Sequence, residues 1–123
     1  AVFAADHVFP GLSNKLQSFS YRVPTSIVSS AVLILQLERD IDVNSLKKRF
    51  EEFECSQKHH IIKNSVKPLV SIDYAKEDYS VIIDHRWTKV EGGKLLKIVY
   101  WYDNEWGYSN RVVDIVKLIA SKY

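Results

Sequence analysis

Apolar residues recur at helical spacing in three parts of the chain. Between residues 42 and 54 they are separated by charged residues, which predicts an amphipathic helix with Asp42 or Asn44 as its N-cap. Further helices are predicted over residues 1–9 and over about 105–122. The apolar faces of the three helices consist of Val2, Ala5 and Phe9; of Val43, Leu46, Phe50 and Phe53; and of Val112, Val113, Val116, Ile119 and Ala120.

Alternating residues and short apolar runs predict strands in much of the remaining chain. These strands cover residues 16–23, 27–37, 69–74, 79–84, 87–91 and 94–102. The Gly92-Gly93 pair between the last two predicts a hairpin turn. The run 31–35 is apolar on both faces, which is typical of a central strand covered on both sides. Residues 55–67 fit no single element, with a short strand at 60–62 as one interpretation.

Helices and strands without a linker, repeat or low-complexity segment indicate one α+β domain over residues 1–123. We expect a mixed, largely antiparallel sheet with two or three helices packed on one face. The chain is 46% hydrophobic and 26% charged, which suits a globular domain with its own core.

The composition also limits the chemistry of the chain. Its four glycines cannot be arranged as G-x-G-x-x-G or G-x-x-x-x-G-K-[ST], so the chain has no sequence for cradling a dinucleotide or a triphosphate. Methionine is absent and the first residue is Ala1. The start is therefore either processed, or the chain is a piece of something longer.

The charge argues against nucleic acid as a partner. The formal net charge is +2, and the longest basic cluster, Lys47-Lys48-Arg49, is followed by three glutamates within 51–54, as on a solvated helix face. The single cysteine, Cys55, indicates a reducing compartment, so we expect a cytoplasmic protein. Residues 1–9 lack the basic region of a signal peptide. No run approaches the roughly 20 apolar residues of a membrane span, so no membrane partner is expected.

The sequence gives little support for a nucleophilic cysteine or for a metal site built from histidines. Cys55 follows acidic residues at the C-terminal end of a predicted helix, where helix dipole and carboxylates disfavour a thiolate, so we expect a structural or surface thiol. His59 and His60 are adjacent and lack a second Cys/His pair at zinc spacing, so no metal site is expected. His7 and His85 stand alone and are interpreted as ordinary surface or capped histidines.

Arg22 is a candidate for phosphate binding. It lies near the end of a predicted strand and is followed by the hydroxyls of Thr25 and Ser26. A guanidinium in this setting either binds a phosphate through two hydrogen bonds or forms an ion pair at a sheet edge. Residue types alone leave both interpretations open.

Residues 101–111 form a second candidate site. Polar and aromatic side chains crowd the point where a buried strand ends and a helix begins. The segment is either a ligand site at a helix N-terminus or a corner capped by Asp103 or Asn104 and packed by Trp106 and Tyr108.

The same segment resembles a known family. Residues 102–114, Tyr-Asp-Asn-Glu-Trp-Gly-Tyr-Ser-Asn-Arg-Val-Val-Asp, look like the C-terminal signature of glyceraldehyde-3-phosphate and erythrose-4-phosphate dehydrogenases. Tyr21-Arg22-Val23-Pro24-Thr25 is similar to the family's Arg-Val-Pro-Thr strand. Weaker similarities follow in collinear order over essentially the whole chain. Residues 55–67 differ from the family, in which a glycine-rich stretch is usual.

The resemblance implies roles for three residues in an NAD-dependent oxidation of a sugar-phosphate aldehyde. Arg22 aligns with an arginine that binds the attacking phosphate or the phosphate of the substrate. Asn104 aligns with the asparagine that hydrogen-bonds the nicotinamide carboxamide of NAD. Tyr108 aligns with an aromatic residue that packs against the nicotinamide.

The resemblance also implies that parts of the enzyme are missing from this chain. The family's nucleophilic cysteine in Ser-Cys-Thr-Thr-Asn, its base histidine and its N-terminal Rossmann domain have no counterpart, and Cys55 does not align with the nucleophile. We therefore expect the C-terminal part of the catalytic domain, with no catalytic residue and no activity as an isolated chain. The expected partners are the Rossmann half, full-length subunits or other copies in a homo-oligomer. The alternative is a non-enzymatic assembly module derived from that domain.

Overall fold

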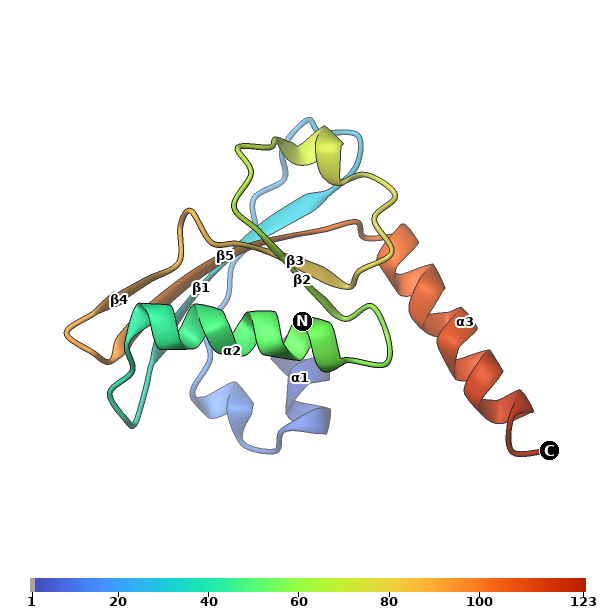
Figure 1. Ribbon diagram of the computed structural model, residues 1–123, viewed down its shortest axis with the longest axis horizontal. Helices are drawn as coiled ribbons and strands as arrows, with labels where there is room; N and C mark the ends of the chain where they lie inside the picture. Colours follow the sequence, from blue (N-terminus) through green and yellow to red (C-terminus); the bar gives the residue numbers. More distant parts are fainter. Residues whose placement is uncertain (1) are drawn as a thin grey trace.

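The computed structural model describes residues 2–123 (Figure 1). Within them lie three α-helices, two short 3-10 helices and one sheet of five strands. In chain order the elements are α1 (Val2–Val8), η1 (Leu12–Asn14), β1 (Ser29–Gln36), α2 (Val43–Ser56), β2 (Ile62–Ser65), η2 (Ser71–Tyr74), β3 (Val81–Asp84), β4 (Lys89–Glu91), β5 (Leu95–Tyr102) and α3 (Trp106–Ala120). The predicted α+β class is confirmed. The helix predicted over residues 1–9 is found as α1, and Ala1 lies outside the described residues.

The sheet is mixed and mostly antiparallel. The strand order is β1-β5-β3-β2, and β4 pairs with the start of β5. β1 and β5 are antiparallel over their full length, from Ser29 opposite Tyr102 to Gln36 opposite Leu95. β2 and β3 run parallel to each other. β5 is the central strand, because it pairs with β1, β3 and β4.

The predicted hairpin joins β4 to β5. Gly92 and Gly93 turn the chain with φ angles of 53° and 72°. This left-handed conformation suits glycine, which has no Cβ to clash with the backbone. The ladder after the turn pairs Glu91 with Leu95, so the prediction is confirmed.

Helix α2 lies across one face of the sheet (Figure 1). Of its two possible caps, Asp42 acts as the N-cap: its Oδ2 accepts a hydrogen bond from the Ser45 N–H at 2.8 Å. Its apolar face packs against the sheet through Leu46 and Phe50. The buried residues beneath them are Ile83, Leu96 and Ile98.

The opposite face of the sheet carries a second, smaller core. Adjacent residues of a strand point to opposite faces, so Ile82 lies on the face opposite to that of Ile83. There it packs with Val28 and Tyr74. The Trp101 ring stacks on Tyr74, with ring centroids 5.3 Å apart. The segment around η2 therefore covers part of this face.

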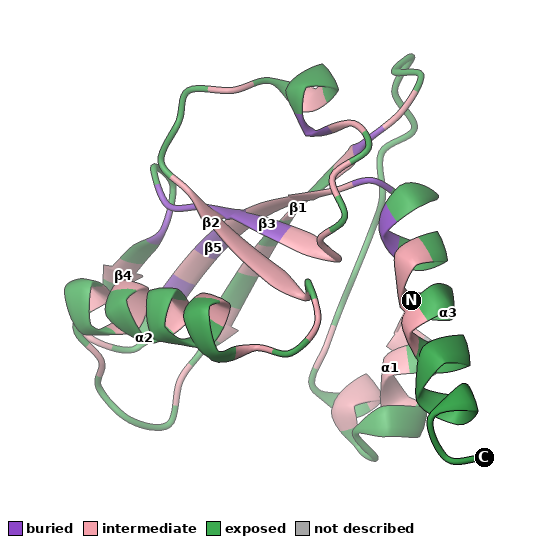
Figure 2. Cartoon of the chain, turned by 45° about the vertical axis from the view of Figure 1, so that its right-hand side comes forward, coloured by how far each residue is buried: buried purple, intermediate pink, exposed green. Residues whose placement is uncertain are grey.

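Helix α3 begins at the sheet and then points away from it (Figure 1). Most of its length is exposed, as the burial colours show (Figure 2). Its apolar side chains are 39% to 59% exposed at Val112, Val113, Ile115, Val116, Leu118 and Ile119. The predicted helix forms, but the described residues leave its apolar face open.

The strand predicted over residues 27–37 exists as β1, but the prediction of a central position is wrong. β1 lies at the edge of the sheet, and every second residue is exposed. Val32 and Ile34 are each 62% exposed. An apolar run indicates that a strand can be covered on both sides, whereas the covering itself must come from another segment.

Two other predicted strands are wrong. Residues 16–23 form no strand, because alternation provides two faces but not the neighbouring backbone that a ladder needs. Residues 69–74 contain η2 instead. There the Asp73 Oδ2 accepts a hydrogen bond from the Val70 N–H at 2.9 Å, a local contact that favours a turn over an extended strand.

Candidate functional site

The turn between β5 and α3 is organised by Asp103, whose residue surface is only 3% exposed. Its Oδ1 accepts hydrogen bonds from the N–H groups of Glu105 at 3.0 Å and Trp106 at 2.9 Å. These bonds satisfy N–H groups that the first turn of α3 leaves unpaired. Its Oδ2 accepts a hydrogen bond from the Lys76 N–H at 2.9 Å. Of the two possible caps, Asp103 therefore acts, and the Asn104 side chain stays exposed.

The Asp103 cap is charged at neutral pH. Burial is the largest influence on its carboxyl and by itself would raise the pKa. The backbone N–H donors of Trp106, Lys76 and Glu105 outweigh burial, so the pKa of Asp103 lies below its ordinary value of 3.8. A negative charge at this position also interacts favourably with the dipole of α3.

Asp78 ties the first turn of α3 to the segment before β3. Its Oδ1 accepts hydrogen bonds from the Trp106 indole N–H at 2.7 Å and from the Asn110 side-chain amide at 3.3 Å. The first turn of α3 also lies close to the backbone of this segment, since a Cβ at Gly107 would lie 3.0 Å from the carbonyl oxygen of Tyr79. The start of α3 is thus held on two sides, by Asp78 and by Asp103.

Asn104 and Tyr108 lie on this corner and face outward. Tyr108 is 71% exposed, so it does not pack the corner as the alternative interpretation required. Trp106 supports the corner through the bond from its indole rather than through burial, since it is 43% exposed. The corner is therefore a capped turn that leaves an amide and an aromatic side chain accessible.

Arg22 is exposed in the irregular segment that leads into β1. It takes part in none of the ion pairs found among residues 2–123. Arg22 precedes β1 in the chain and Asn104 follows β5, and the first residue of β1, Ser29, lies opposite the last residue of β5, Tyr102.

The other candidate residues are dispersed. Cys55 is exposed near the C-terminal end of α2. The His59 Nδ1 lies 3.4 Å from an Asp114 carboxylate oxygen, and the His60 ring stacks on Tyr79 with centroids 4.7 Å apart. In the part of the chain that the structure describes, no three His, Cys, Asp or Glu side chains are grouped to hold a metal ion. None of the helices within residues 2–123 has the length and apolarity of a membrane span.

The surface interpretation of His85 is wrong. The residue is 3% exposed, and both of its ring nitrogens have partners. Nδ1 lies 3.0 Å from the Thr88 Oγ1, and Nε2 lies 2.7 Å from the Asn64 Oδ1. No local pattern signals this burial, because Asn64 lies 21 residues away.

The buried ion pair between Asp84 and Arg86 was not predicted from the sequence. Asp84 has no exposed surface, and the Arg86 guanidinium donates to both of its oxygens, from Nε at 2.8 Å and from Nη2 at 2.5 Å. The Trp101 indole N–H adds a longer bond of 3.4 Å. Burial favours the neutral carboxyl, but the bonds from Arg86 outweigh it and hold the pKa of Asp84 below its ordinary value.

One apolar groove lies elsewhere. It measures about 230 Å³, runs beneath α2, and is lined by Leu46, Arg49, Phe50, Phe53 and Ile62. None of these residues belongs to the candidate site. Arg22, Asn104 and Tyr108 are each exposed, and none of them lines this groove.

These features define a class of protein: an α+β domain with a capped strand-to-helix turn that exposes an amide and an aromatic ring. Residues 1–104 match the sequence model of the family described as glyceraldehyde 3-phosphate dehydrogenase, C-terminal domain. The chain belongs to this family. The match includes Arg22 and Asn104, and Tyr108 lies beyond it.

Curated relatives agree with the family. The chain is 40% identical over 121 residues to glyceraldehyde-3-phosphate dehydrogenase 2 of Staphylococcus aureus (strain MRSA252), covering 98% of this chain and 35% of the relative. It is 39% identical over 123 residues to glyceraldehyde-3-phosphate dehydrogenase A, chloroplastic, of Chlamydomonas reinhardtii, covering 100% of this chain and 33% of the relative. The chain thus spans about a third of the length of these relatives.

Proposed function

We propose that the chain is the C-terminal part of the catalytic domain of an NAD-dependent dehydrogenase. Its substrate is a sugar-phosphate aldehyde, either glyceraldehyde 3-phosphate or erythrose 4-phosphate. Family membership supports the dehydrogenase class. The observation that carries the proposal is the Asp103-capped turn, because it fixes the backbone of Asn104 while leaving its side chain accessible.

The exposed side chains suit the nicotinamide end of the cofactor. The Asn104 amide offers both a donor and an acceptor, which matches the donor and acceptor of a carboxamide. The Tyr108 ring, one helical turn further on, offers an apolar face to an aromatic ring. NAD, when bound, supplies the hydride acceptor. Asn104 orients the nicotinamide, and Tyr108 covers one side of it.

Arg22 binds the phosphate in this proposal. Its guanidinium is exposed and carries no ion pair within the described residues, so it remains available to an anion. Arginine suits this role because its planar fork can donate two parallel hydrogen bonds to phosphate oxygens.

The isolated chain has no dehydrogenase activity of its own in this proposal, because it offers no activated nucleophile. Cys55 lies on α2, and it belongs neither to the segment that carries Arg22 nor to the turn that carries Asn104. Residues 1–123 form one domain that completes its site with a dinucleotide-binding half or with full-length subunits. Incubating the purified chain with NAD, inorganic phosphate and either aldehyde should produce no NADH. Formation of NADH above the protein-free control would contradict the proposal that the isolated chain is inactive.

Ligand binding can be tested separately from activity. In a 15N NMR titration of the chain, nicotinamide nucleotide should shift the resonances of residues 104–108, and inorganic phosphate should shift those around Arg22. Asn104→Ala and Arg22→Gln should remove the respective shifts. The matched controls Asn44→Ala and Arg39→Gln alter exposed residues elsewhere and should keep them. Shifts that survive Asn104→Ala would remove the basis for the nicotinamide assignment.

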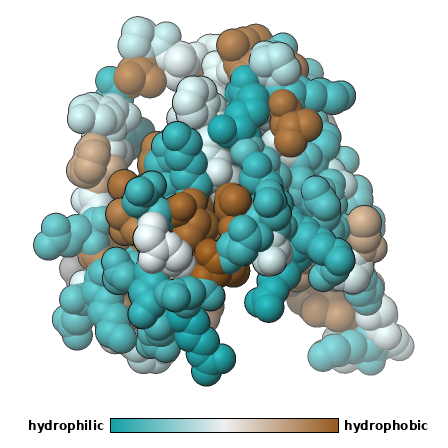
Figure 3. Space-filling view, turned by 60° about the vertical axis from the view of Figure 1, so that its left-hand side comes forward, coloured by the Kyte–Doolittle hydropathy of each residue, from teal (hydrophilic) through white to brown (hydrophobic). Residues whose placement is uncertain are grey.

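A second candidate function is a non-enzymatic oligomerisation module. It is favoured by apolar surface on β1, where Val32 and Ile34 are exposed, and along α3. Figure 3 shows apolar side chains gathered in the middle of an otherwise hydrophilic face. Apolar patches of this kind drive association. Sedimentation velocity should show a concentration-dependent dimer or larger species, whereas a monomer that binds no apolar dye would contradict this candidate.

A further inference from the structure

The two outer strands of the sheet, β1 and β2, differ in how their edges are covered. β2 is four residues long, and side chains that follow or belong to α2 bind its backbone. Gln57 accepts a hydrogen bond from the Ile62 N–H at 2.9 Å. Glu54 accepts one from the Asn64 N–H at 2.9 Å. These side chains occupy positions at which another strand would otherwise pair, so the edge of β2 is protected.

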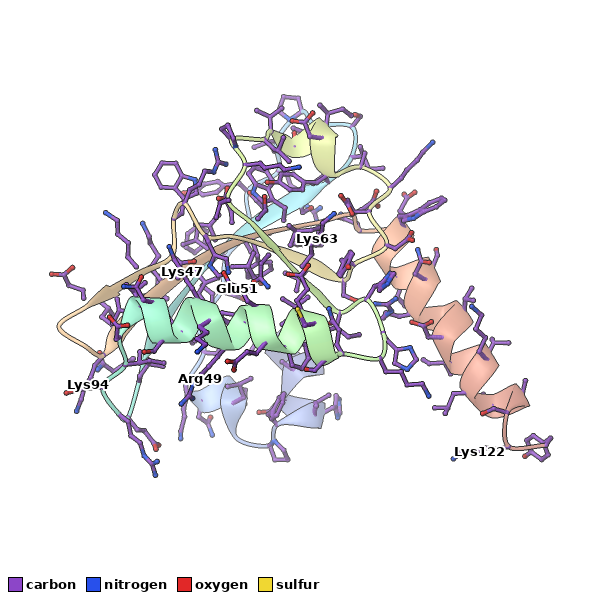
Figure 4. The ribbon with its side chains drawn as sticks, viewed as in Figure 1. Lys47, Arg49, Glu51, Lys63, Lys94 and Lys122 are labelled. Carbon is purple, nitrogen blue, oxygen red and sulfur yellow. The ribbon has the colours of Figure 1, made fainter. Side chains whose placement is uncertain are left out.

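β1 has no comparable protection within residues 2–123. It is eight residues long and pairs with β5 without a bulge, and its other side has no ladder partner. Its sequence, Ser-Ser-Ala-Val-Leu-Ile-Leu-Gln, contains neither the charges nor the proline with which edge strands discourage pairing. The charged side chains labelled in Figure 4 extend instead from α2, β2, the β4–β5 turn and the end of the chain. The edge of β1 is therefore open to another strand.

Residues 16–23 have the pattern of a strand but no ladder. Phe19, Tyr21 and Val23 alternate with mostly polar residues, and these three are 83%, 80% and 61% exposed. Among the described residues, the segment makes one hydrogen bond, in which the Val23 carbonyl oxygen accepts from the Thr25 N–H. Figure 2 draws its path outside the sheet and almost entirely in the colour of exposed residues. The segment thus lacks the neighbouring backbone that a ladder needs.

The connection from this segment to β1 is short and comprises residues 24–28, beginning with Pro24. Its last residue, Val28, has a φ of 69°, which is uncommon for a β-branched residue. Val28 is also buried against Tyr74 and Ile82, so the start of β1 is anchored in the second core. Short connections under strain favour the exchange of a segment between two copies over pairing within one copy.

We propose that the edge of β1 is a strand-pairing surface whose partner is residues 16–23 of a second copy of this chain. Each copy has both an open edge and an unpaired segment, so two copies can exchange their segments reciprocally about a two-fold axis. Each five-stranded sheet then gains one strand, antiparallel to β1. The inference does not depend on the proposed dehydrogenase function, and it gives the oligomerisation candidate a defined interface.

The apolar pattern indicates the register of the exchanged strand. In an antiparallel ladder, residues directly opposite each other point to the same face. Phe19 and Tyr21 can therefore lie on the face of β1 that exposes Val32 and Ile34. A shift by one residue would place serines there and leave the apolar surface of both strands uncovered. Since Arg22 is the only charged residue of the segment and β1 has none, no like charges oppose each other.

NMR on a mixed sample tests the exchange. Labelled (13C, 15N) and unlabelled 123-residue chains are unfolded together in urea and refolded, so that mixed dimers form. Isotope-filtered NOEs should connect residues 16–23 of one copy with β1 of the other. Alternate β1 amides, which face outward in the monomer, should gain hydrogen-exchange protection as the concentration rises. A chain that remains monomeric at NMR concentrations would overturn the proposal, as would 16–23 to β1 NOEs that arise only within one copy.

A proline pair tests the role of the backbone of residues 16–23. Successive N–H groups of a strand alternate in direction, so one proline of Gln17→Pro/Ser20→Pro falls on an N–H that the ladder needs. Both residues are exposed, and the amides of the β1–β5 ladder should keep their protection. The dimer dissociation constant from sedimentation velocity should rise about tenfold or more. The control Gln17→Ala/Ser20→Ala keeps both N–H groups, and equal dissociation constants for the two chains would refute strand pairing.

A lysine pair separates strand pairing from general apolar association. Ile34→Lys places a charge on β1 where Phe19 and Tyr21 of the second copy are expected, and it should also weaken the dimer about tenfold. The control Ile115→Lys replaces a similarly exposed isoleucine on α3, since the two residues are 62% and 57% exposed. It should leave the dissociation constant unchanged. Weakening by Ile115→Lys alone, or equally by both variants, would assign the association to apolar surface on α3 and contradict the exchange.

Discussion

The backbone N–H of Lys76 donates a hydrogen bond of 2.9 Å to the buried Asp103 carboxylate, across 27 residues of sequence. Lys76 has a positive φ of 61°, which is uncommon for a residue other than glycine. The bond joins the loop before β3 to the start of α3 and holds the turn that carries Asn104. A buried charge therefore helps to hold the geometry of this corner.

Asp103→Ala should destabilise the chain by about 2–3 kcal/mol. The substitution removes the acceptor of the Glu105 and Trp106 N–H groups at the start of α3, and it leaves the Lys76 N–H without its acceptor. Urea denaturation followed by circular dichroism measures the loss. The control Glu105→Gln changes an exposed neighbour and should stay within about 0.5 kcal/mol of the unmodified chain. A loss as small as that of the control would show that the cap contributes little.

The charge of Asp103 should make stability depend on acid pH. A carboxyl whose folded pKa lies below its ordinary 3.8 contributes stability above that value, and this contribution is lost as the pH falls through the folded pKa. Asp103→Asn keeps an oxygen acceptor but has no charge. The stability difference between the chain and this variant should therefore shrink as the pH falls from 7 to 3. Urea titrations at several pH values measure it, and a constant difference would contradict the prediction.

Gly107→Ala should destabilise the chain, although alanine is favoured over glycine within helices by about 1 kcal/mol. The added Cβ would lie 3.0 Å from the Tyr79 carbonyl oxygen, and that oxygen belongs to backbone that cannot rotate away. The start of α3 and the Tyr79 backbone must then move apart by a few tenths of an ångström, which should weaken the Trp106–Asp78 bond and change the Trp106 fluorescence. Ser109→Ala, on an exposed position of the same helix, is the control. A Gly107→Ala chain that is more stable than the unmodified chain would show that the space between α3 and the Tyr79 backbone accommodates a Cβ.

Arg86→Leu should destabilise the chain by about 3 kcal/mol, because it leaves the fully buried Asp84 charge without its partner. The pKa of Asp84 should rise in the variant, so its loss of stability should be smaller at low pH. Adding Asp84→Asn should recover part of the loss by removing the unpaired charge. A double-mutant cycle measures this, and purely additive losses would argue against a coupled pair.

Asn104→Ala should leave the free energy of unfolding within about 0.5 kcal/mol of the unmodified chain. The side chain is exposed, and the cap is provided by Asp103. Thermal or urea denaturation tests this. A larger loss would assign Asn104 a structural role in the corner, whereas no loss leaves the residue available for a ligand.

The elements that were predicted correctly have local signals. α2 is marked by its apolar spacing and by the Asp42 cap three residues before its bonding partner Ser45. The β4–β5 hairpin is marked by Gly92-Gly93, whose φ angles are a property of those residues. In both cases the information lies within a few residues, so a sequence pattern can carry it.

The wrong strand predictions share one cause. Residues 16–23 have the alternation of a strand, and β1 has the composition of a covered strand, but pairing and covering are supplied by other segments. The same difference holds at the candidate site. Asn104 and Tyr108 are predicted from a local motif, whereas Asp78 binds Trp106 from 28 residues away, and no local pattern predicts that bond.

By itself, the sequence determined the family, the α+β class, α2 and the hairpin, because each depends on short motifs or on periodicity. It also predicts Arg22, Asn104 and Tyr108 as ligand-binding residues. Only the tertiary structure decided that β1 lies at an edge, that Asp103 rather than Asn104 caps α3, and that His85 and Asp84 are buried. The physical reason is that burial, strand pairing and the choice of hydrogen-bond partner depend on which distant segments meet. The bond between Lys76 and Asp103 is the clearest instance.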